Sequence, residues 1–101
     1  RIIARNYRTR LGEIDIVASI NDTICFIEVK TRLSERFGSA LEAVSGFKQR
    51  QIAKAALAYL KEDKFLERRA RFDVVSVRFE GNKPKIDIVR NAFELSQHFI
   101  Y

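Results

Sequence analysis

The sequence predicts a single α/β domain with a mixed central β-sheet and elements in the order β-β-β-α-β-β. Three observations predict this fold class. Two β-rich runs are separated by two turn-forming residues, a long amphipathic segment follows them, and two further β-rich runs come after it. With 101 residues, 47% hydrophobic and 32% charged, the chain is long enough for one hydrophobic core but not for two.

Five strands are expected from β-rich runs bounded by turn-forming residues. The central pair, residues 14–20 and 23–30, flanks Asn21-Asp22, and two such residues between β-rich runs are typical of a hairpin. The other strands are expected at residues 2–9, an edge strand before a turn at Leu11-Gly12, and at residues 71–79 and 85–90, around a turn with Gly81 and Pro84.

One long helix is expected from Ser45, a favourable N-cap residue, to about Glu62. Its apolar residues recur at helical spacing on one stripe, which contains Ile52, Ala56, Tyr59 and Leu60. A helix that connects two strands of one sheet makes a right-handed crossover. We therefore expect strands 23–30 and 71–79 to be parallel, with the helix covering one face of the sheet.

The remaining segments suggest less regular structure. A polar loop is expected after Thr31, a short helical turn at residues 40–44, and the tail from Asn91 is compatible with a short helix. The sequence contains no repeat, low-complexity tract or linker. Residues 1–101 are therefore expected to form one domain.

The composition restricts the classes of function. A net charge of +6 and an isoelectric point near 9.8 favour a polyanionic partner, since basic proteins bind nucleic acids by releasing condensed counterions. No apolar run reaches the roughly 20 residues of a membrane span and no secretory leader opens the chain, so a cytoplasmic protein without membrane contact is expected. The single cysteine, Cys25, lies in an apolar run and is expected to be a buried hydrophobic residue.

The expected hairpin brings charged residues together. If Asn21 and Asp22 are the two turn residues, Asp15 faces Glu28 and Glu13 faces Lys30. Because side chains alternate along a strand, all four should then project from one face. Directly opposed residues have Cβ atoms about 4.5–5.5 Å apart, which is close enough for two carboxylates to bind one cation.

This cluster predicts a metal site. Opposed carboxylates destabilise a sheet unless something neutralises them, and Mg²⁺ or Mn²⁺ prefers such oxygen ligands. Lys30 would add a cation that stabilises charge on a phosphoryl group. The structural alternative is a set of salt bridges on a solvated sheet face. The apolar neighbours Val17 and Phe26 on the same face argue against it, because a solvated face should be polar throughout.

Several separated motifs resemble the bacterial YraN family across nearly the whole chain. They are Gly12-Glu13-Ile14-Asp15, residues 26–32 with the sequence FIEVKTR, Phe37-Gly38, Lys48-Gln49-Arg50 and residues 71–75 with the sequence RFDVV. That family is similar to archaeal Holliday junction resolvases and to the wider restriction-endonuclease-like fold, the PD-(D/E)xK nucleases. The resemblance implies a metal-dependent nuclease core with Asp15 and Glu28 as metal ligands, assistance from the Val29 carbonyl, and Lys30 as the catalytic lysine.

The resemblance also implies an acidic residue on a helix upstream of the segment that starts at Arg1. The chain contains no methionine, so an upstream segment is expected. This sequence lacks that helix, and the site is expected to be incomplete without it unless Glu13 substitutes as a ligand. The alternative role of Glu13 is a salt bridge to Lys30.

For other polar residues, the sequence favours a role in the site less strongly. Gln49 lies at the start of the apolar helical stripe and could reach the acids, although a polar helix end explains its position as well. Asp73 is expected to make a structural hydrogen bond, and His98 has no partner motif. Basic residues expected to contact phosphates, or to form a solvated basic face, are Lys48, Arg50, Lys54 and Arg32.

The leading functional hypothesis is an endonuclease that hydrolyses DNA phosphodiester bonds, with branched DNA as the substrate that the resemblance suggests. The alternatives are a nucleic-acid-binding module that does not cleave and a protein-interaction adaptor on the same fold. Symmetric cleavage of two strands would need two sites, so a homodimer is compatible with the first hypothesis. The edge strand at residues 2–9 is one candidate surface for it.

Overall fold

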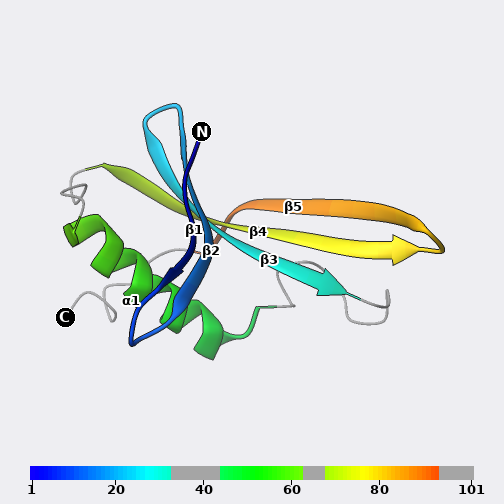
Figure 1. Cartoon of the computed structure of the whole chain (residues 1–101), viewed down its shortest axis with the longest axis horizontal. Coiled ribbons are helices and arrows are strands. Elements are labelled where there is room, and N and C mark those ends of the chain that lie inside the picture. Colours follow the sequence, from blue (N-terminus) through cyan, green and yellow to red (C-terminus); the bar gives the residue numbers. More distant parts are fainter. Residues whose placement is uncertain (33–43, 63–67, 94–101) are drawn as a thin grey trace.

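The structure, a computed structural model, describes residues 1–32, 44–62 and 68–93. Within these ranges the elements follow the predicted order (Figure 1). They are the strands β1 (Ile2–Arg8), β2 (Glu13–Ile20) and β3 (Thr23–Arg32), the helix α1 (Gly46–Glu62), and the strands β4 (Arg69–Glu80) and β5 (Lys83–Phe93). The Phe37-Gly38 motif, His98 and nearly all of the helical turn predicted at 40–44 lie outside the described residues.

The strands form one sheet in the order β1-β2-β3-β4-β5. Strands β3 and β4 are parallel, as the crossover through α1 predicted, and the other neighbouring pairs are antiparallel. The sheet is therefore mixed. The prediction for the tail was wrong at its start, because Asn91 to Phe93 continue β5 and no helix can begin at Asn91.

The turn between β2 and β3 has the predicted length. Asn21 and Asp22 have φ angles of 48° and 65°, and two successive left-handed residues are characteristic of a type I′ turn. The pairing runs from Ile20 with Thr23 to Ile16 with Ile27, so the predicted register is confirmed over this part of the hairpin. The turn residues thereby determine which side chains reach the covered face.

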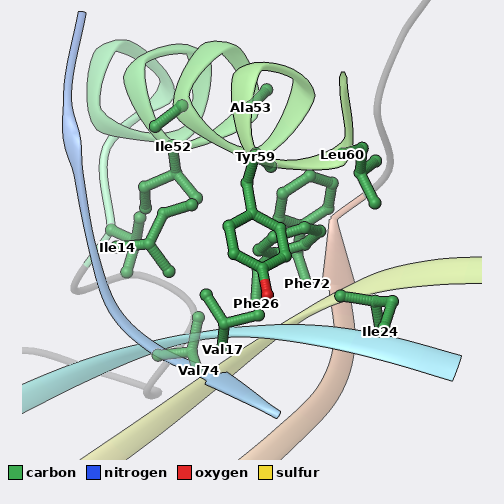
Figure 2. Close-up of a cluster of buried hydrophobic side chains, with 13 residues drawn as sticks. Ile14, Val17, Ile24, Phe26, Ile52, Ala53, Tyr59, Leu60, Phe72 and Val74 are labelled. Atoms are coloured by element: carbon green, nitrogen blue, oxygen red, sulfur yellow. The ribbon is translucent and has the colours of Figure 1, made fainter. Parts of the chain in front are cut away.

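Helix α1 covers one face of the sheet and builds the core with it (Figure 2). Phe26 stacks on Phe72 with ring centroids 5.6 Å apart, and Tyr59 of the helix packs edge-on against Phe26 at 5.9 Å. Each large side chain that is fully buried in this way contributes about 1.5–3 kcal/mol. The predicted stripe on α1 is confirmed, because Ile52, Ala56, Tyr59 and Leu60 are all buried.

Strand β5 is irregular at Asn91, where it pairs with β4. Asn91 has a φ of 52°, and Val74 and Phe72 of β4 pair with Val89 and Phe93 of β5, so β5 holds extra residues there. Asp73, between the two β4 residues, accepts a hydrogen bond from the Asn91 amide at 2.9 Å. A bulge of this kind twists a strand locally.

Away from α1, β4 and β5 continue as a long hairpin (Figure 1). Its residues 75–78 in β4 still pair with β3, and the end of the hairpin extends past β3. Its turn contains Gly81, with a φ of 62°, and Asn82. We call residues 75–88 the arm. In the described part of the chain, β5 forms one edge of the sheet and β1 forms the other.

Two predictions from composition concern the interior and the membrane. Cys25 is fully buried, as expected, and burial raises the pKa of its thiol. Among the helical residues that the structure describes, no helix has the length and apolarity needed to cross a membrane.

Candidate metal and phosphate site

The two carboxylates at the centre of the prediction lie where β2 and β3 separate. The described pairing of the two strands ends at Ile16 and Ile27, one pair before Asp15 and Glu28. Beyond that point a side chain replaces the backbone pairing, because Asp15 Oδ2 accepts a hydrogen bond from the Val29 amide at 2.8 Å. The predicted ladder pairs of Asp15 with Glu28 and of Glu13 with Lys30 are therefore not formed.

The physical reason is an irregularity in the alternation of side chains along β2. Ile14 and Val17 are three residues apart, yet both are buried in the core under α1 (Figure 2). Asn6 of β1 has a φ of 52° and lies between the residues that pair with Ile16 and Ile14, so it faces Asp15. The prediction assumed that side chains alternate regularly along β2, and this assumption was wrong at Asp15. The Asp15 side chain is hydrogen-bonded to the backbone of β3.

Glu28 is the most buried charged group of the cluster, with 5% of its surface exposed. Burial raises the pKa of its carboxyl group above the ordinary value, and the negative charge of Asp15 raises it further. Glu13 acts in the same direction, whereas Lys48 and Lys30 lower this pKa. The acids thus act on one another electrostatically, although the predicted ladder is not formed.

Two lysines lie beside the Glu28 carboxylate. The Nζ of Lys30 is 3.8 Å from Glu28 Oε1, and the Nζ of Lys48 is 4.0 Å from the same oxygen. Both side chains are about one-third exposed. Lys30 comes from the same strand face as Glu28, two residues further along. Lys48 comes from the first turn of α1, and no spacing in the sequence indicated that it would meet this acid.

The start of α1 is organised locally around Ser45. Its hydroxyl accepts a hydrogen bond from the Lys48 amide at 3.1 Å, which confirms the predicted N-cap. The Gln49 side-chain amide donates to the Val44 carbonyl at 3.1 Å. The Gln49 side chain thus binds the backbone at the start of α1. This agrees with the prediction of a polar helix end and not with the prediction that Gln49 reaches the acids.

Glu13 has a different partner from the one predicted. Its Oε1 lies 3.4 Å from Nε of Arg8, its neighbour across the β1–β2 pair. The predicted alternative, a salt bridge to Lys30, is replaced by this exposed ion pair. Glu13 still influences the pKa of Glu28, so it lies at the border of the cluster.

The oxygen atoms near Glu28 can be compared with the ligands that Mg²⁺ takes in proteins. Among the residues that the structure describes, no group of three or more His, Cys, Asp or Glu side chains could hold a metal. Two carboxylates, Asp15 and Glu28, are available instead, with the Val29 carbonyl next to Glu28 in the chain. Mg²⁺ usually keeps several waters and binds through one or two carboxylates together with substrate phosphates. The residues therefore fit an ion that is shared with a phosphate better than one enclosed by protein ligands.

The remaining predicted residues fall into two groups. Arg50 and Lys54 are exposed on α1, and Arg32 is the last residue of β3. Contact of these three residues with phosphates stays a prediction. Asp73 is buried and accepts hydrogen bonds from the Arg71 side chain at 3.1 Å and from the Asn91 amide. The prediction of a structural role for Asp73 is confirmed.

Comparisons with known proteins place the chain among relatives. Over residues 1–77 it matches the model of a family described as "Uncharacterised protein family UPF0102". It is 53% identical to a UPF0102 protein of Geobacter metallireducens over 96 residues, which are 95% of this chain and 79% of that protein. Identity is 50% to a UPF0102 protein of Geobacter sulfurreducens, over 95% of this chain and 76% of that one, and 50% to one of Alkaliphilus oremlandii, over 92% and 81%.

Proposed function

We propose, from the premise that this chain belongs to the UPF0102 family, that it is a metal-dependent nuclease that hydrolyses DNA phosphodiester bonds. UPF0102 is the YraN family, so the family resemblance carried by the motifs is confirmed. The nuclease assignment and a restriction-endonuclease-like core are inferences that go beyond family membership.

The observation that carries the proposal is the electrostatic state of Glu28. This carboxylate is almost completely buried, and its pKa is raised by burial and by Asp15. Among the residues that the structure describes, its nearest cations are Lys30 and Lys48, at 3.8 and 4.0 Å. Charges that serve only stability are normally paired closely when they are buried. Within the described residues, Glu28 is a buried acid beside a second acid, with its cations near the upper limit of ion-pair distance. Such an arrangement is characteristic of a site that gains a further counter-charge from a ligand.

Each residue of the cluster has a chemical role in this proposal. Asp15 and Glu28 would hold Mg²⁺ or Mn²⁺ with the Val29 carbonyl, and the ion would supply a water of lowered pKa for attack on phosphorus. Lys30 would stabilise the negative charge that develops on the phosphoryl oxygens. Lys48 stands in the first helical turn, where the helix dipole favours anions, and would bind a neighbouring phosphate.

The proposal is tested by incubating the protein with linear and branched DNA in the presence of Mg²⁺ or Mn²⁺. The variants are Asp15→Asn and Lys30→Ala. Asparagine keeps an oxygen that can accept the Val29 amide hydrogen bond, so the first change removes charge and leaves that contact. Lys61→Ala, an exposed lysine in the last turn of α1, is the matched control.

We expect cleavage that depends on the metal and falls at least about 100-fold in Asp15→Asn and Lys30→Ala, with Lys61→Ala unchanged. Stronger cutting of branched than of linear DNA would identify the substrate. Binding of DNA without any cutting, or cutting that survives both substitutions, would contradict the proposal and favour a non-cleaving nucleic-acid-binding module.

A further inference from the structure

We propose that two copies of this protein form a dimer by pairing their β5 strands in an antiparallel orientation, centred on Ile86. This surface is the outer edge of the arm and is separate from the candidate metal site. It also differs from the β1 edge, which the sequence alone suggested as a candidate surface.

The apolar side chains of the arm are the first observation. Ile86, Ile88 and Phe79 are 62%, 56% and 50% exposed. The ladder places them on one side, because Val77 pairs with Ile86, Val75 with Ile88 and Phe79 with Pro84. Ile86 and Ile88 lie on the edge strand β5, and Phe79 lies beside it on β4. Exposed apolar side chains gathered at a sheet edge are typical of a surface that another chain covers.

The second observation is the direction of the free backbone groups on β5. In a two-residue hairpin the residues next to the turn, Glu80 and Lys83, exchange hydrogen bonds, and bonded and non-bonded pairs alternate from there. Pro84, Ile86 and Ile88 therefore direct their backbone groups away from β4, toward the open edge. Pro84 has no amide hydrogen, and an outward position is the one that proline tolerates in a sheet.

These outward groups fit a second copy in one register. When Ile86 faces Ile86 of the second copy, the two residues can exchange both of their backbone hydrogen bonds. Ile88 then faces Pro84 of the second copy and donates its amide hydrogen to the Pro84 carbonyl, which needs no amide hydrogen from proline. The missing hydrogen of Pro84 also stops the pairing from extending much further toward the turn.

Charge selects the same register. With Ile86 facing itself, Lys85 faces Asp87 of the second copy, and this happens twice by symmetry. Shifting by two residues in one direction places Lys85 opposite Lys85, and shifting in the other direction places Asp87 opposite Asp87. Like charges that are directly opposed destabilise a sheet. Of these three registers, only the first opposes Lys85 and Asp87 without also opposing two like charges.

Contacts within the arm explain why Lys85 would gain from this arrangement. Lys85 pairs with Arg78 in the ladder, so two cations stand opposite each other. Both share the Glu80 carboxylate, at 3.5 Å for Lys85 and 3.2 Å for Arg78. Asp87 also lies 3.3 Å from Nε of Arg78 in its own arm, so each arm has an alternating row of acidic and basic side chains. Lys85 of one copy would add a second cation beside the Asp87 carboxylate of the other copy. A nucleic acid fits this edge less well, because acidic and apolar residues interrupt the basic ones along β5.

The test is the mass of the protein in solution, measured over a range of concentrations by sedimentation, for the unmodified protein and two variants. We expect a species of twice 11.7 kDa. Asp87→Lys places two lysines opposite each other at both symmetric positions and should weaken dimerisation at least about tenfold. The double variant Lys85→Asp with Asp87→Lys restores opposite charges across the interface and should recover the dimer.

A cysteine cross-link tests the register independently. Ile86→Cys places two thiols across the two-fold axis at a Cα separation of about 5.5 Å, within the range of disulfides. Diamide, which accepts the two hydrogens that the thiols lose, should give a covalent dimer, whereas Lys83→Cys, which faces Val89 of the second copy, should not. A monomer at all concentrations, a dimer that Asp87→Lys leaves intact, or equal cross-linking of both cysteine variants would overturn the inference.

Discussion

At the scale of single residues, Glu28 is the central group of the candidate site. It is held on the buried face of β3 next to a second acid, with two lysines at distances near 4 Å. Ionisation of such a group costs free energy that the folded protein must supply from other contacts. Glu28 is therefore expected to reduce stability in the absence of a bound cation, and the reduction should depend on pH.

The sign of this pH dependence follows from the raised pKa. Between the ordinary carboxyl value of 4.5 and the higher folded-state value, the folded protein binds more protons than the unfolded chain, so its stability falls as pH rises. Above the folded-state pKa the loss is complete and constant. The Glu28→Gln variant should lack this decrease and be more stable than the unmodified protein at neutral pH. Urea unfolding at several pH values without divalent cations checks this, and parallel curves for both proteins would contradict it.

Metal binding should reverse the effect of Glu28 on stability. A ligand that binds only the folded state stabilises it by about 2.7 kcal/mol at one hundred times its dissociation constant. Mg²⁺ should therefore raise the melting temperature of the unmodified protein, with a much smaller rise for Glu28→Gln and Asp15→Asn. Thermal unfolding across a Mg²⁺ titration measures this without any substrate. Equal rises in all three proteins would show that the ion binds elsewhere.

At the scale of elements, the site depends on how closely the β1–β2 turn approaches α1. Gly12 directly precedes β2 and lies against the helix, where an added Cβ would stand 2.7 Å from the Gln51 carbonyl oxygen. Thr9 supports the turn with its hydroxyl, which accepts a hydrogen bond from the Gly12 amide at 3.1 Å. The absence of a side chain at Gly12 thus allows β2 and α1 to bring Asp15 and Lys48 into one region.

Substitution of Gly12 by alanine should force the turn and the helix apart. Because the obstructing atom belongs to the helix backbone, we expect a loss of about 1–3 kcal/mol in the free energy of unfolding. Gly46→Ala is the matched control, since its nearest neighbour is the flexible end of Arg50 at 3.7 Å. Alanine is also the better helix former, so the control should be neutral or slightly stabilising. Chemical denaturation of both variants tests the difference.

At the scale of the whole molecule, the positive charge and the placement of basic side chains determine how a polyanion would approach. The net charge of +6 gives long-range attraction that is independent of base sequence. Lys48 joins the acids, whereas Arg50 and Lys54 stay exposed on the same helix. The helix therefore connects the candidate site with a basic surface that a DNA backbone could follow.

Removal of two exposed charges should weaken DNA binding by a salt-dependent amount. Each phosphate that the protein no longer neutralises should reduce the slope of log affinity against log salt concentration by about 0.9. The variant Arg50→Ala with Lys54→Ala should thus bind linear duplex DNA less tightly and with a shallower slope, while its Mg²⁺-induced stabilisation is unchanged. Fluorescence anisotropy at several salt concentrations measures the slopes, and an unaltered slope would exclude this surface.

Local sequence determined much of this molecule by itself. Asn21 and Asp22 are residues that adopt left-handed conformations readily, so they select a tight turn and with it the register of β2 and β3. Ser45 offers a hydroxyl to the first helical turn, and the spacing of Ile52, Ala56 and Leu60 defines the face that the helix buries. These features depend on neighbours a few residues apart, which the sequence displays directly.

Only the tertiary structure decided how the charged groups meet. Opposite the left-handed Asn6, Asp15 accepts a hydrogen bond from the β3 backbone instead of pairing with Glu28. The packing of α1 on the sheet places Lys48 beside Glu28. Strand periodicity could not predict either, because it assumes regular alternation and contains no information on how a helix is set against a sheet. The sequence identified Asp15, Glu28 and Lys30 as the charged residues of the candidate site. The distances between them and the pKa of Glu28 depend on burial, and burial follows only from the packing of the whole chain.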